Sequence, residues 1–319
     1  MKRRVGVVGT LVWDVIHAPP PACERTEGWG GLAYALSGLD AALADDWEIV
    51  PLIKVGADVA EGGQAFVRGL RHAAPDAALV EVPEPNDRSE LRYYSEERRH
   101  ERRSGGVPPW TREAIARALD AARLDALYVN FLSGWELDLD AMRDVRARFA
   151  GPIYTDLHMM LWRPDEAGRR SLTPLADAAA WCACFDLIQM NEDEMAMLAP
   201  DPAALAAMAL GAGARCTMVT LGARGVAWHA APGFARLADL AAPPAAGAPA
   251  CGMVATESER HGAGVDPTGC GDVWGATAFA RLLAGDALVD ALGAANRAAG
   301  RNAGWHGVAG LVEHLRARD

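Results

Sequence analysis

A glycine-rich loop that ends in a carboxylate occupies residues 266–275, Asp-Pro-Thr-Gly-Cys-Gly-Asp-Val-Trp-Gly. It opens a predicted helix over residues 273–283, so its backbone N–H groups lie at the positive end of a helix dipole and suit a phosphate. Asp272 lies inside this anion site, where it would repel a phosphate. An enzyme that takes a proton from a hydroxyl as it attacks a phosphoryl group needs a base at such a position. A helix-capping role explains Asp272 equally well.

The loop resembles the signature Asp-Thr-x-Gly-Ala-Gly-Asp of the PfkB (ribokinase-like) carbohydrate kinases. The resemblance implies that Asp272 is the catalytic base and that the amides of Gly269, Cys270 and Gly271 stabilise the transferring phosphoryl group. Pro267 and Cys270 replace the commoner Thr and Ala. Neither replacement removes a needed amide, because only the proline itself lacks an N–H group.

Composition excludes several other classes of protein. The chain has 319 residues, of which 51% are hydrophobic, and a net charge of −11, whereas a nucleic-acid-binding protein normally carries a basic patch. Lys2 and Lys54 are the only lysines, and no Gly-Lys-Ser/Thr sequence is present, so the chain has no P-loop. The His-Arg-Asp and Asp-Phe-Gly motifs of protein kinases are also missing.

The six cysteines show neither a Cys-x-x-Cys pair nor zinc-type spacing. The chain enters a strand pattern at Val5 without a signal-length apolar segment, and no stretch approaches the length of a membrane span. We therefore expect a reduced cytoplasmic protein without a membrane or nucleic-acid partner.

Apolar strand-like segments alternate with helical segments along most of the chain, which predicts an α/β fold with a mostly parallel sheet and right-handed crossovers. The resemblance implies that this fold is a ribokinase-like three-layer sandwich. It would form a single domain, residues 1–319, with a small β-lid. The expected strands are 5–9, 48–55, 126–131, 153–156, 185–190 and 216–221, and the expected helices are 32–39, 58–72, 138–149, 172–182 and 273–283.

Two segments, around 14–29 and 86–107, are expected to form the lid. The second holds the alternating stretch 89–94 and then a charged run, which indicates a strand with one wet face. A solvated hairpin is an equally good interpretation of the same residues. The resemblance also raises the possibility of a homodimer formed through the lid.

Polar residues near the ends of the first strands are candidates for binding an acceptor. Asp14 follows the expected strand 5–9, and ligands of open α/β sheets bind beyond the carboxyl ends of strands. The resemblance implies that Asp14 and the pair Gly30-Gly31 contact the sugar, although paired glycines also make tight turns. Asn130, at the end of a later strand, is assigned to the same site. Ala35 stands where the family has a substrate-binding Asn, which leaves the acceptor's identity open.

Three further motifs follow in the family's chain order. Asn191 and Glu194 resemble Asn-x-x-Glu, which organises Mg²⁺ and its waters near the nucleotide phosphates; one indirect glutamate suffices because Mg²⁺ keeps most of its waters. The alternative is a helix cap at Asn191 with acids in the first turn. The remaining candidates for nucleotide contacts are Thr220, Gly222, Gly225 and Asn302, of which the glycines also suit a hairpin turn.

The segment 156–160, Asp-Leu-His-Met-Met, occupies the region where many relatives have Asp-x-Asn-x-Arg. Met160 takes the arginine position, and Arg163 is the nearest cation in the sequence. Charge on the transferring phosphoryl group must be neutralised. If Arg163 does not reach it, the helix dipole and Mg²⁺ carry more of that load.

These observations predict an ATP- and Mg²⁺-dependent kinase that phosphorylates a hydroxyl of a sugar or sugar-like molecule. A nucleoside kinase of the same fold is the closest alternative and would need an apolar or aromatic slot for the base. A non-catalytic ligand-binding relative is a second alternative, favoured by Ala35 and Met160. A dinucleotide oxidoreductase is more distant, because its glycine fingerprint follows an early strand and lacks an acid in the turn.

Overall fold

The computed structural model describes residues 2–17, 25–94, 99–164, 166, 170–256 and 266–317. Its main sheet has the order β14-β13-β12-β11-β8-β7-β1-β3-β4, in which β13 runs antiparallel to both of its neighbours and all the other pairs are parallel. The strands of this sheet are β1 (Arg3–His17), β3 (Trp47–Gly56), β4 (Val80–Val82), β7 (Ala126–Asn130), β8 (Ile153–Asp156), β11 (Leu187–Asn191), β12 (Cys216–Thr220), β13 (Val226–Ala230) and β14 (Ala250–Val254).

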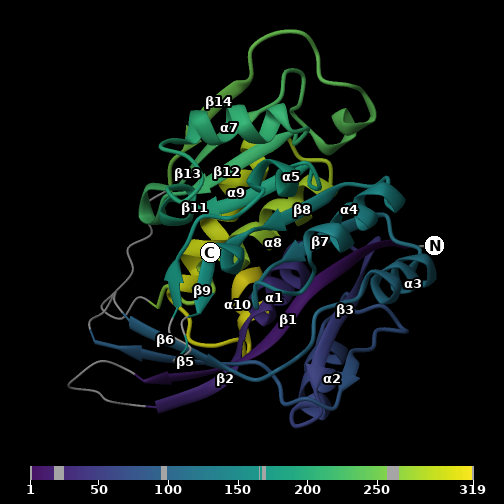
Figure 1. Cartoon of the computed structure of the whole chain (residues 1–319), viewed down its shortest axis with the longest axis vertical. Helices are drawn as coiled ribbons and strands as arrows, with labels where there is room; N and C mark the ends of the chain where they lie inside the picture. Colours follow the sequence, from purple (N-terminus) through teal and green to yellow (C-terminus); the bar gives the residue numbers. More distant parts are fainter. Residues whose placement is uncertain are drawn as a thin grey trace.

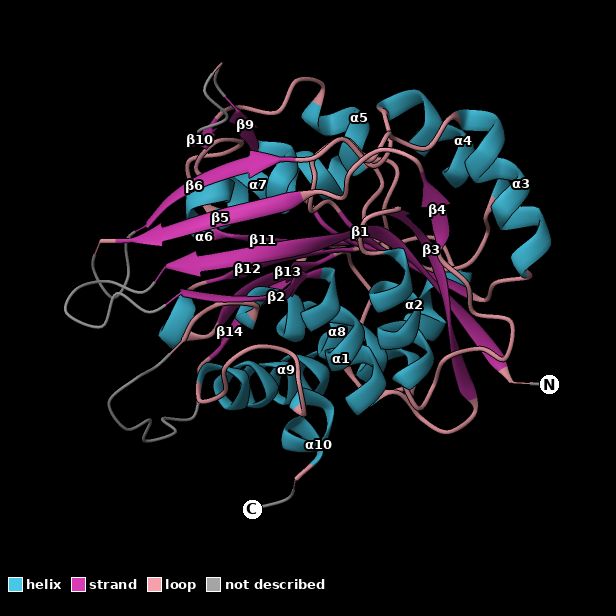
Figure 2. Cartoon of the chain, turned by 90° about the horizontal axis from the view of Figure 1, so that it is seen from below, coloured by secondary structure: helices cyan, strands magenta, loops and turns pink. Residues whose placement is uncertain are grey.

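Helices cover both faces of the sheet, which gives three layers (Figures 1 and 2). The helices are α1 (Leu32–Ala42), α2 (Ala60–Gly69), α3 (Arg112–Ala122), α4 (Leu139–Arg148), α5 (Ala178–Cys182), α6 (Glu192–Met195), α7 (Pro202–Gly211), α8 (Cys270–Leu283), α9 (Leu288–Ala303) and α10 (Leu311–Arg316). One apolar core joins the sheet to α1, α2, α8 and α9, and the other joins it to α3, α4, α5 and α7.

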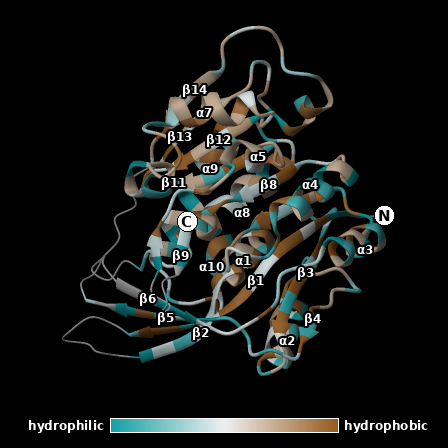
Figure 3. Ribbon diagram, viewed as in Figure 1, coloured by the Kyte–Doolittle hydropathy of each residue, from teal (hydrophilic) through white to brown (hydrophobic). Residues whose placement is uncertain are grey.

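The two cores follow from the alternation of side chains along buried strands. In β1, Val5 and Val7 point into the first core and Val8 into the second, and in β7 Tyr128 and Val129 divide in the same way. Strands buried on both faces are mainly apolar, as the brown stretches of β1, β3 and β11 in the hydropathy colouring illustrate (Figure 3). The predicted α/β fold with its mostly parallel sheet is therefore confirmed.

β1 does not end at Gly9 as the sequence predicted. It continues through Asp14 to His17 and passes from the main sheet into the lid, so that Asp14 lies on a strand rather than in a loop beyond one. Residues 11–16 are rich in β-branched and large apolar side chains, and two neighbouring strands supply the hydrogen bonds that a longer strand needs.

The lid is a small sheet of order β2-β1-β5-β6 that extends from the body at the lower left of Figure 1. It adds β2 (Arg25–Gly31), β5 (Arg88–Tyr93) and β6 (Arg99–Ser104) to the second half of β1. The expected β-lid is thus present; residues 18–24 and 95–98 of the predicted lid segments lie outside the described residues.

One predicted helix is wrong. The range 172–182 contains only a short helix, α5, after a two-stranded sheet made of β9 (Trp162–Pro164) and β10 (Arg170–Leu172). Of this range only Leu172 pairs with β9, and Asp177 adopts a positive φ of 54°, so the helix begins only at Ala178. Among the described residues, no helix combines the length and the apolar character that a bilayer crossing requires.

Candidate active site

A cavity of about 650 Å³ lies at the carboxyl ends of the central strands, between the lid and the start of α8. Four groups of residues line most of it: the loop 267–272, one face of the lid, the segments 220–225 and 296–303, and the strand ends at 156–159 and 189–194. Polar segments distant in sequence thus meet at the sheet edge where α/β proteins bind ligands.

The loop that opens α8 has the geometry of an anion site. Gly269 adopts φ +74°, and a Cβ atom there would lie 2.2 Å from the ring of Tyr34, so only glycine fits. The N–H group of Thr268 donates to Asp266 Oδ1 at 2.9 Å, and that of Cys270 donates to the Pro267 carbonyl at 3.2 Å. No acceptor among the described residues bonds the N–H groups of Gly269 and Gly271, which leaves them for a ligand.

Asp272 lies in the first turn of α8 and lines the cavity. Its Oδ1 accepts a hydrogen bond of 2.7 Å from Nδ2 of Asn130, at the end of β7. Burial raises the pKa of Asp272 to about 6, against the opposing effects of His158 and Asn130. The carboxylate is therefore oriented and is a stronger base than an exposed aspartate, as a general base near neutral pH should be.

Sequence reasoning assigned Asn130 to the acceptor, but its side chain is fully buried and is bonded to Asp272. Its position suits the orientation of that carboxylate. Gln189 of β11 supports the same helix start, because its Nε2 donates to the Gly271 carbonyl at 3.0 Å and its Oε1 accepts from Tyr154 Oη at 2.5 Å. Side chains from three central strands thus hold the beginning of α8 in place.

The lid lines the opposite end of the cavity through alternate residues of three strands. These residues are Val12 and Asp14 of β1, Ser89 and Leu91 of β5, and Glu101 and Arg103 of β6. In the sheet register, Asp14 pairs with Ser89 and Ser89 pairs with Arg103, so the three side chains form one polar row.

The two predicted glycines have different positions. Gly31 lines the cavity, whereas Gly30 lies beneath Asp14: a Cβ atom on Gly30 would be 1.7 Å from Asp14 Oδ2. The absent side chain therefore makes room for the Asp14 carboxylate, which is 8% exposed.

The donor-side candidates Thr220, Gly222 and Gly225 all line the cavity, in the connection of the β12–β13 hairpin. These residues therefore belong to a hairpin connection and also line the cavity. Asn302 is fully buried; its Nδ2 donates to the Thr268 carbonyl at 2.9 Å and lies 3.3 Å from Cys270 Sγ. It braces the anion loop from α9.

A histidine that sequence reasoning did not select lines the same cavity. His158 Nδ1 donates to Glu194 Oε1 at 2.7 Å, and burial alone would lower the pKa of His158, but Glu194 raises it to about 9. Arg163 is exposed and is not among the lining residues, and Met160 is buried. Within the described part of the cavity, the cations are therefore His158 and Arg103.

Glu194 is 1% exposed and forms a capping box with Asn191: Asn191 Oδ1 accepts from the Glu194 N–H at 2.9 Å, and Glu194 Oε2 accepts from the Asn191 N–H at 3.0 Å. Both residues also line the cavity. Asn191 and Glu194 therefore cap α6 and also face the cavity.

A hydrated Mg²⁺ fits this region. Burial raises the pKa of Asp156 well above its ordinary value, and the neighbouring Glu194 and Asp272 add to this rise against the opposing effect of His158. No group of three or more His, Cys, Asp or Glu side chains among the described residues is arranged as a direct metal cage. Mg²⁺ needs only one or two carboxylates besides its waters and the substrate phosphates.

The residues that sequence reasoning missed are Ser89, Glu101, Arg103, His158 and Gln189. The sequence held a signal for one of them, since His158 takes the Asn position of Asp-x-Asn-x-Arg. The others come from strands whose register is not visible in the sequence.

No family model and no curated protein matches the sequence. Solved structures do match over the whole chain. A pyrophosphate-dependent kinase in the ribokinase family, complexed with a pyrophosphate analog and myo-inositol, has a TM-score of 0.74 and 14% identity, covering 98% of this chain and 100% of its own.

Two further structures are similar. The ribokinase of Arabidopsis thaliana, complexed with ribose and ATP, has a TM-score of 0.67 and 16% identity and covers 100% of both chains. A Burkholderia thailandensis nucleoside kinase in complex with inosine has a TM-score of 0.68 and 13% identity, covering 96% of this chain and 92% of its own. The chain has the ribokinase fold, in agreement with the resemblance seen in its sequence.

Proposed function

We propose that this protein is a kinase that transfers a phosphoryl group to a hydroxyl of a sugar or sugar-like molecule. The observation that carries the proposal is Asp272, an oriented base with a pKa of about 6, placed beside the free amides of Gly269 and Gly271. A helix cap alone needs neither the bond from Asn130 nor a cavity of 650 Å³ in front of the carboxylate. Structures of the same fold bind ribose, myo-inositol or inosine, which supports an acceptor of this class.

In the proposed reaction the acceptor hydroxyl lies between Asp14 and Asp272. Asp272 takes its proton, and the oxygen forms a bond to the terminal phosphorus of the donor while the bond from that phosphorus to the leaving oxygen breaks. The Gly269 and Gly271 amides and the N-terminus of α8 stabilise the charge on the transferring group. Asn130 keeps the carboxylate in position.

His158 supplies positive charge from the segment 156–160, in which Met160 stands at the arginine position of relatives. Its bond to Glu194 and its pKa of about 9 make it an imidazolium at neutral pH. Mg²⁺, held through Glu194 and Asp156, would neutralise charge on the donor phosphates. The donor's leaving group would occupy the part of the cavity lined by Thr220, Gly222 and Gly225.

We propose ATP as the donor. Ala299, Gly300 and Ala303 give α9 a wall of small side chains that leaves space for a purine. Pyrophosphate belongs in the same test, because one similar structure is a pyrophosphate-dependent kinase.

The test is donor consumption in Mg²⁺ with either donor, against ribose, other sugars, myo-inositol and nucleosides. We expect turnover that needs both an acceptor and Mg²⁺ and that is lost in Asp272→Asn. Calorimetry that detects no binding of either donor in Mg²⁺ would refute the kinase and leave a ligand-binding protein. A strong preference for nucleosides would favour the nucleoside kinase, whose base could pack against Leu91, Leu132 and Met159.

A further inference from the structure

The acceptor end of the cavity carries more negative than positive charge. Asp14, Glu101 and Asp272 line it as carboxylates, and Arg103 is the lining cation at this end among the described residues. These side chains come from β1, β6 and α8, so the excess of carboxylates arises only in the folded chain.

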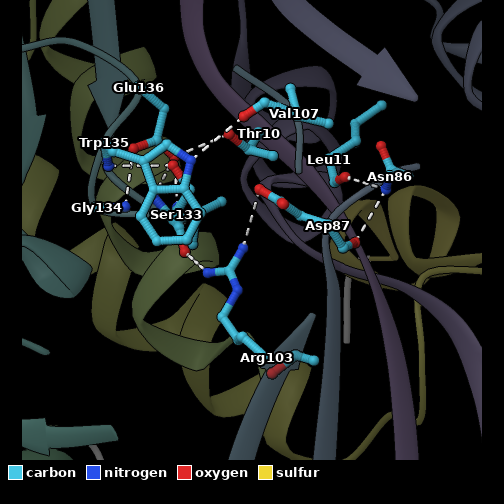
Figure 4. Close-up of polar contacts among 12 residues, drawn as sticks. Thr10, Leu11, Asn86, Asp87, Arg103, Val107, Ser133, Gly134, Trp135 and Glu136 are labelled. Carbon is cyan, nitrogen blue, oxygen red and sulfur yellow. Dashed lines mark hydrogen bonds and ion pairs between the residues drawn. The ribbon is translucent and has the colours of Figure 1, made fainter. Parts of the chain in front are cut away.

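The charge of Arg103 is already matched within the protein (Figure 4). Its guanidinium donates to the Leu132 carbonyl and to Asp87 Oδ2, the latter at 3.4 Å. The side chains of Arg103 and Asp87 are only 6% and 1% exposed. An anionic group on an acceptor would have to compete with this buried carboxylate for the same guanidinium.

A second arginine, Arg170, offsets part of the charge of Glu101, but the carboxylates around this end of the cavity still outnumber the arginines. Arg170 donates to the Ser133 carbonyl at 3.0 Å and does not line the cavity. Glu136, which is 4% exposed, lies in the same neighbourhood and adds another carboxylate to the surroundings of both arginines.

Glu101 is placed to bind hydroxyl groups. It lies on β6 opposite Leu91, and its Oε1 accepts a hydrogen bond of 3.1 Å from Ser89 Oγ. Ser89 is 6% exposed, so this bond limits the positions of the Glu101 side chain. A carboxylate accepts hydrogen bonds through both oxygens, which suits neighbouring hydroxyls and repels a phosphate or a second carboxylate.

We propose that Glu101, held by Ser89, is a specificity-determining residue that selects an uncharged polyhydroxy acceptor over its phosphorylated or carboxylated derivatives. The inference rests on the proposed kinase function and narrows the acceptor class of the same site. Glu101 binds through the lid, whereas Asp272 acts on the reacting hydroxyl, so the two carboxylates have separable effects.

The experiment compares matched acceptors: ribose with ribose 5-phosphate, glucose with glucuronate, and myo-inositol with a myo-inositol monophosphate. Wild type, Glu101→Gln and Ser89→Ala are assayed with the donor that calorimetry shows to bind. Glu113→Gln, an exposed glutamate in the first turn of α3, serves as the control. Circular dichroism and melting temperature establish that each variant is folded.

Wild type should prefer the uncharged member of the pair that it uses. In Glu101→Gln we expect the KM for the uncharged acceptor to rise about tenfold while kcat changes little. The ratio of kcat/KM for the uncharged acceptor to that for the anionic acceptor should fall about tenfold. Ser89→Ala should change the acceptor KM and the preference for the uncharged acceptor in the same directions, by smaller factors. If Glu101→Gln does not fold, Ser89→Ala alone tests the proposal. Glu113→Gln should match wild type.

A wild-type preference for a phosphorylated or carboxylated acceptor would overturn the inference and leave the kinase function intact. An unchanged preference in both Glu101→Gln and Ser89→Ala would overturn it as well. If wild type binds neither donor and turns over no acceptor, the proposed function itself fails and the inference fails with it.

Discussion

Replacing Asp272 by Asn tests the central proposal, because the change keeps the shape of the side chain and removes its basicity. The Asn130 bond can persist, since an amide oxygen at the Oδ1 position still accepts from Nδ2. What disappears is the proton acceptor, so turnover should fall about a hundredfold or more. Donor affinity should stay the same or rise slightly, because a negative charge beside the phosphates is removed.

The structure also predicts that the variant is more stable than wild type. The pKa of Asp272 is raised from 3.8 to about 6 chiefly by burial, so the ionised form is unfavourable in the folded protein. Each pKa unit corresponds to about 1.4 kcal/mol, which sets an upper limit of about 3 kcal/mol on this cost. The asparagine gives up the attraction of a carboxylate to the helix N-terminus, about 0.3–1 kcal/mol. The free energy of unfolding should therefore rise at pH 8, by no more than about 2–3 kcal/mol.

The sign of the pH dependence follows from the raised pKa. Below pH 3.8 the carboxyl group is protonated in both the folded and the unfolded chain, so its charge has no cost. Between pH 3.8 and about 6 the carboxyl group is ionised in the unfolded chain but mostly protonated in the folded chain, so the free-energy cost of ionising it in the folded protein increases with pH. Above pH 6 the group is ionised in both states and this cost has its full value. The stability gain of Asp272→Asn should accordingly grow from pH 4 to pH 6 and then level off. In the wild type, kcat/KM, which reports the free enzyme, should fall as the pH drops through about 6.

Asp290→Asn is the matched control, because Asp290 is an exposed acid in the first turn of α9. It should leave turnover unchanged and should cost at most about 1 kcal/mol. Urea denaturation at several pH values, calorimetry with the donor, and turnover on an identified acceptor complete the assay. If Asp272→Asn behaves like Asp290→Asn, with turnover near that of wild type, Asp272 is only an acid in the first turn of α8 and the proposed mechanism is refuted.

Three further predictions concern residues around Asp272. Asp14→Ala should raise the acceptor KM at least about tenfold and leave donor affinity unchanged; equal losses of both in calorimetry would make Asp14 structural. Asn130→Ala should lower kcat and move the acid limb of the kcat/KM pH profile upward, because the Asn130 bond lowers the pKa of Asp272; an unmoved limb would contradict the orienting role. Arg103→Met should cost about 3–5 kcal/mol of stability by leaving Asp87 buried without its partner, and adding Asp87→Asn should restore part of it; urea titrations showing no recovery would mean that the pair is not the cause.

The sequence determined the features that depend on local chemistry. The anion loop and Asp272 are contiguous, and a helix start with Gly269 at positive φ is a property of those few residues. The alternation of apolar strands and helices likewise predicted the layered fold, because strands buried on both faces are mainly apolar.

Tertiary structure decided the relations between distant segments. Asn130 and Asp272 are separated by 142 residues, and His158 and Glu194 by 36, so their bonds depend on the order of β7, β8 and β11 in the sheet. The continuation of β1 into the lid depends on pairing with β2 and β5.

The same reason explains why Ser89 and Glu101 were not found as site residues. A one-residue change of strand register would turn both side chains to the other face of the lid, and register is fixed by partner strands and by the turns that join them. The local alternation of residues 89–94 indicates a strand with one polar face. Only the assembled sheet decides which polar side chains face the cavity.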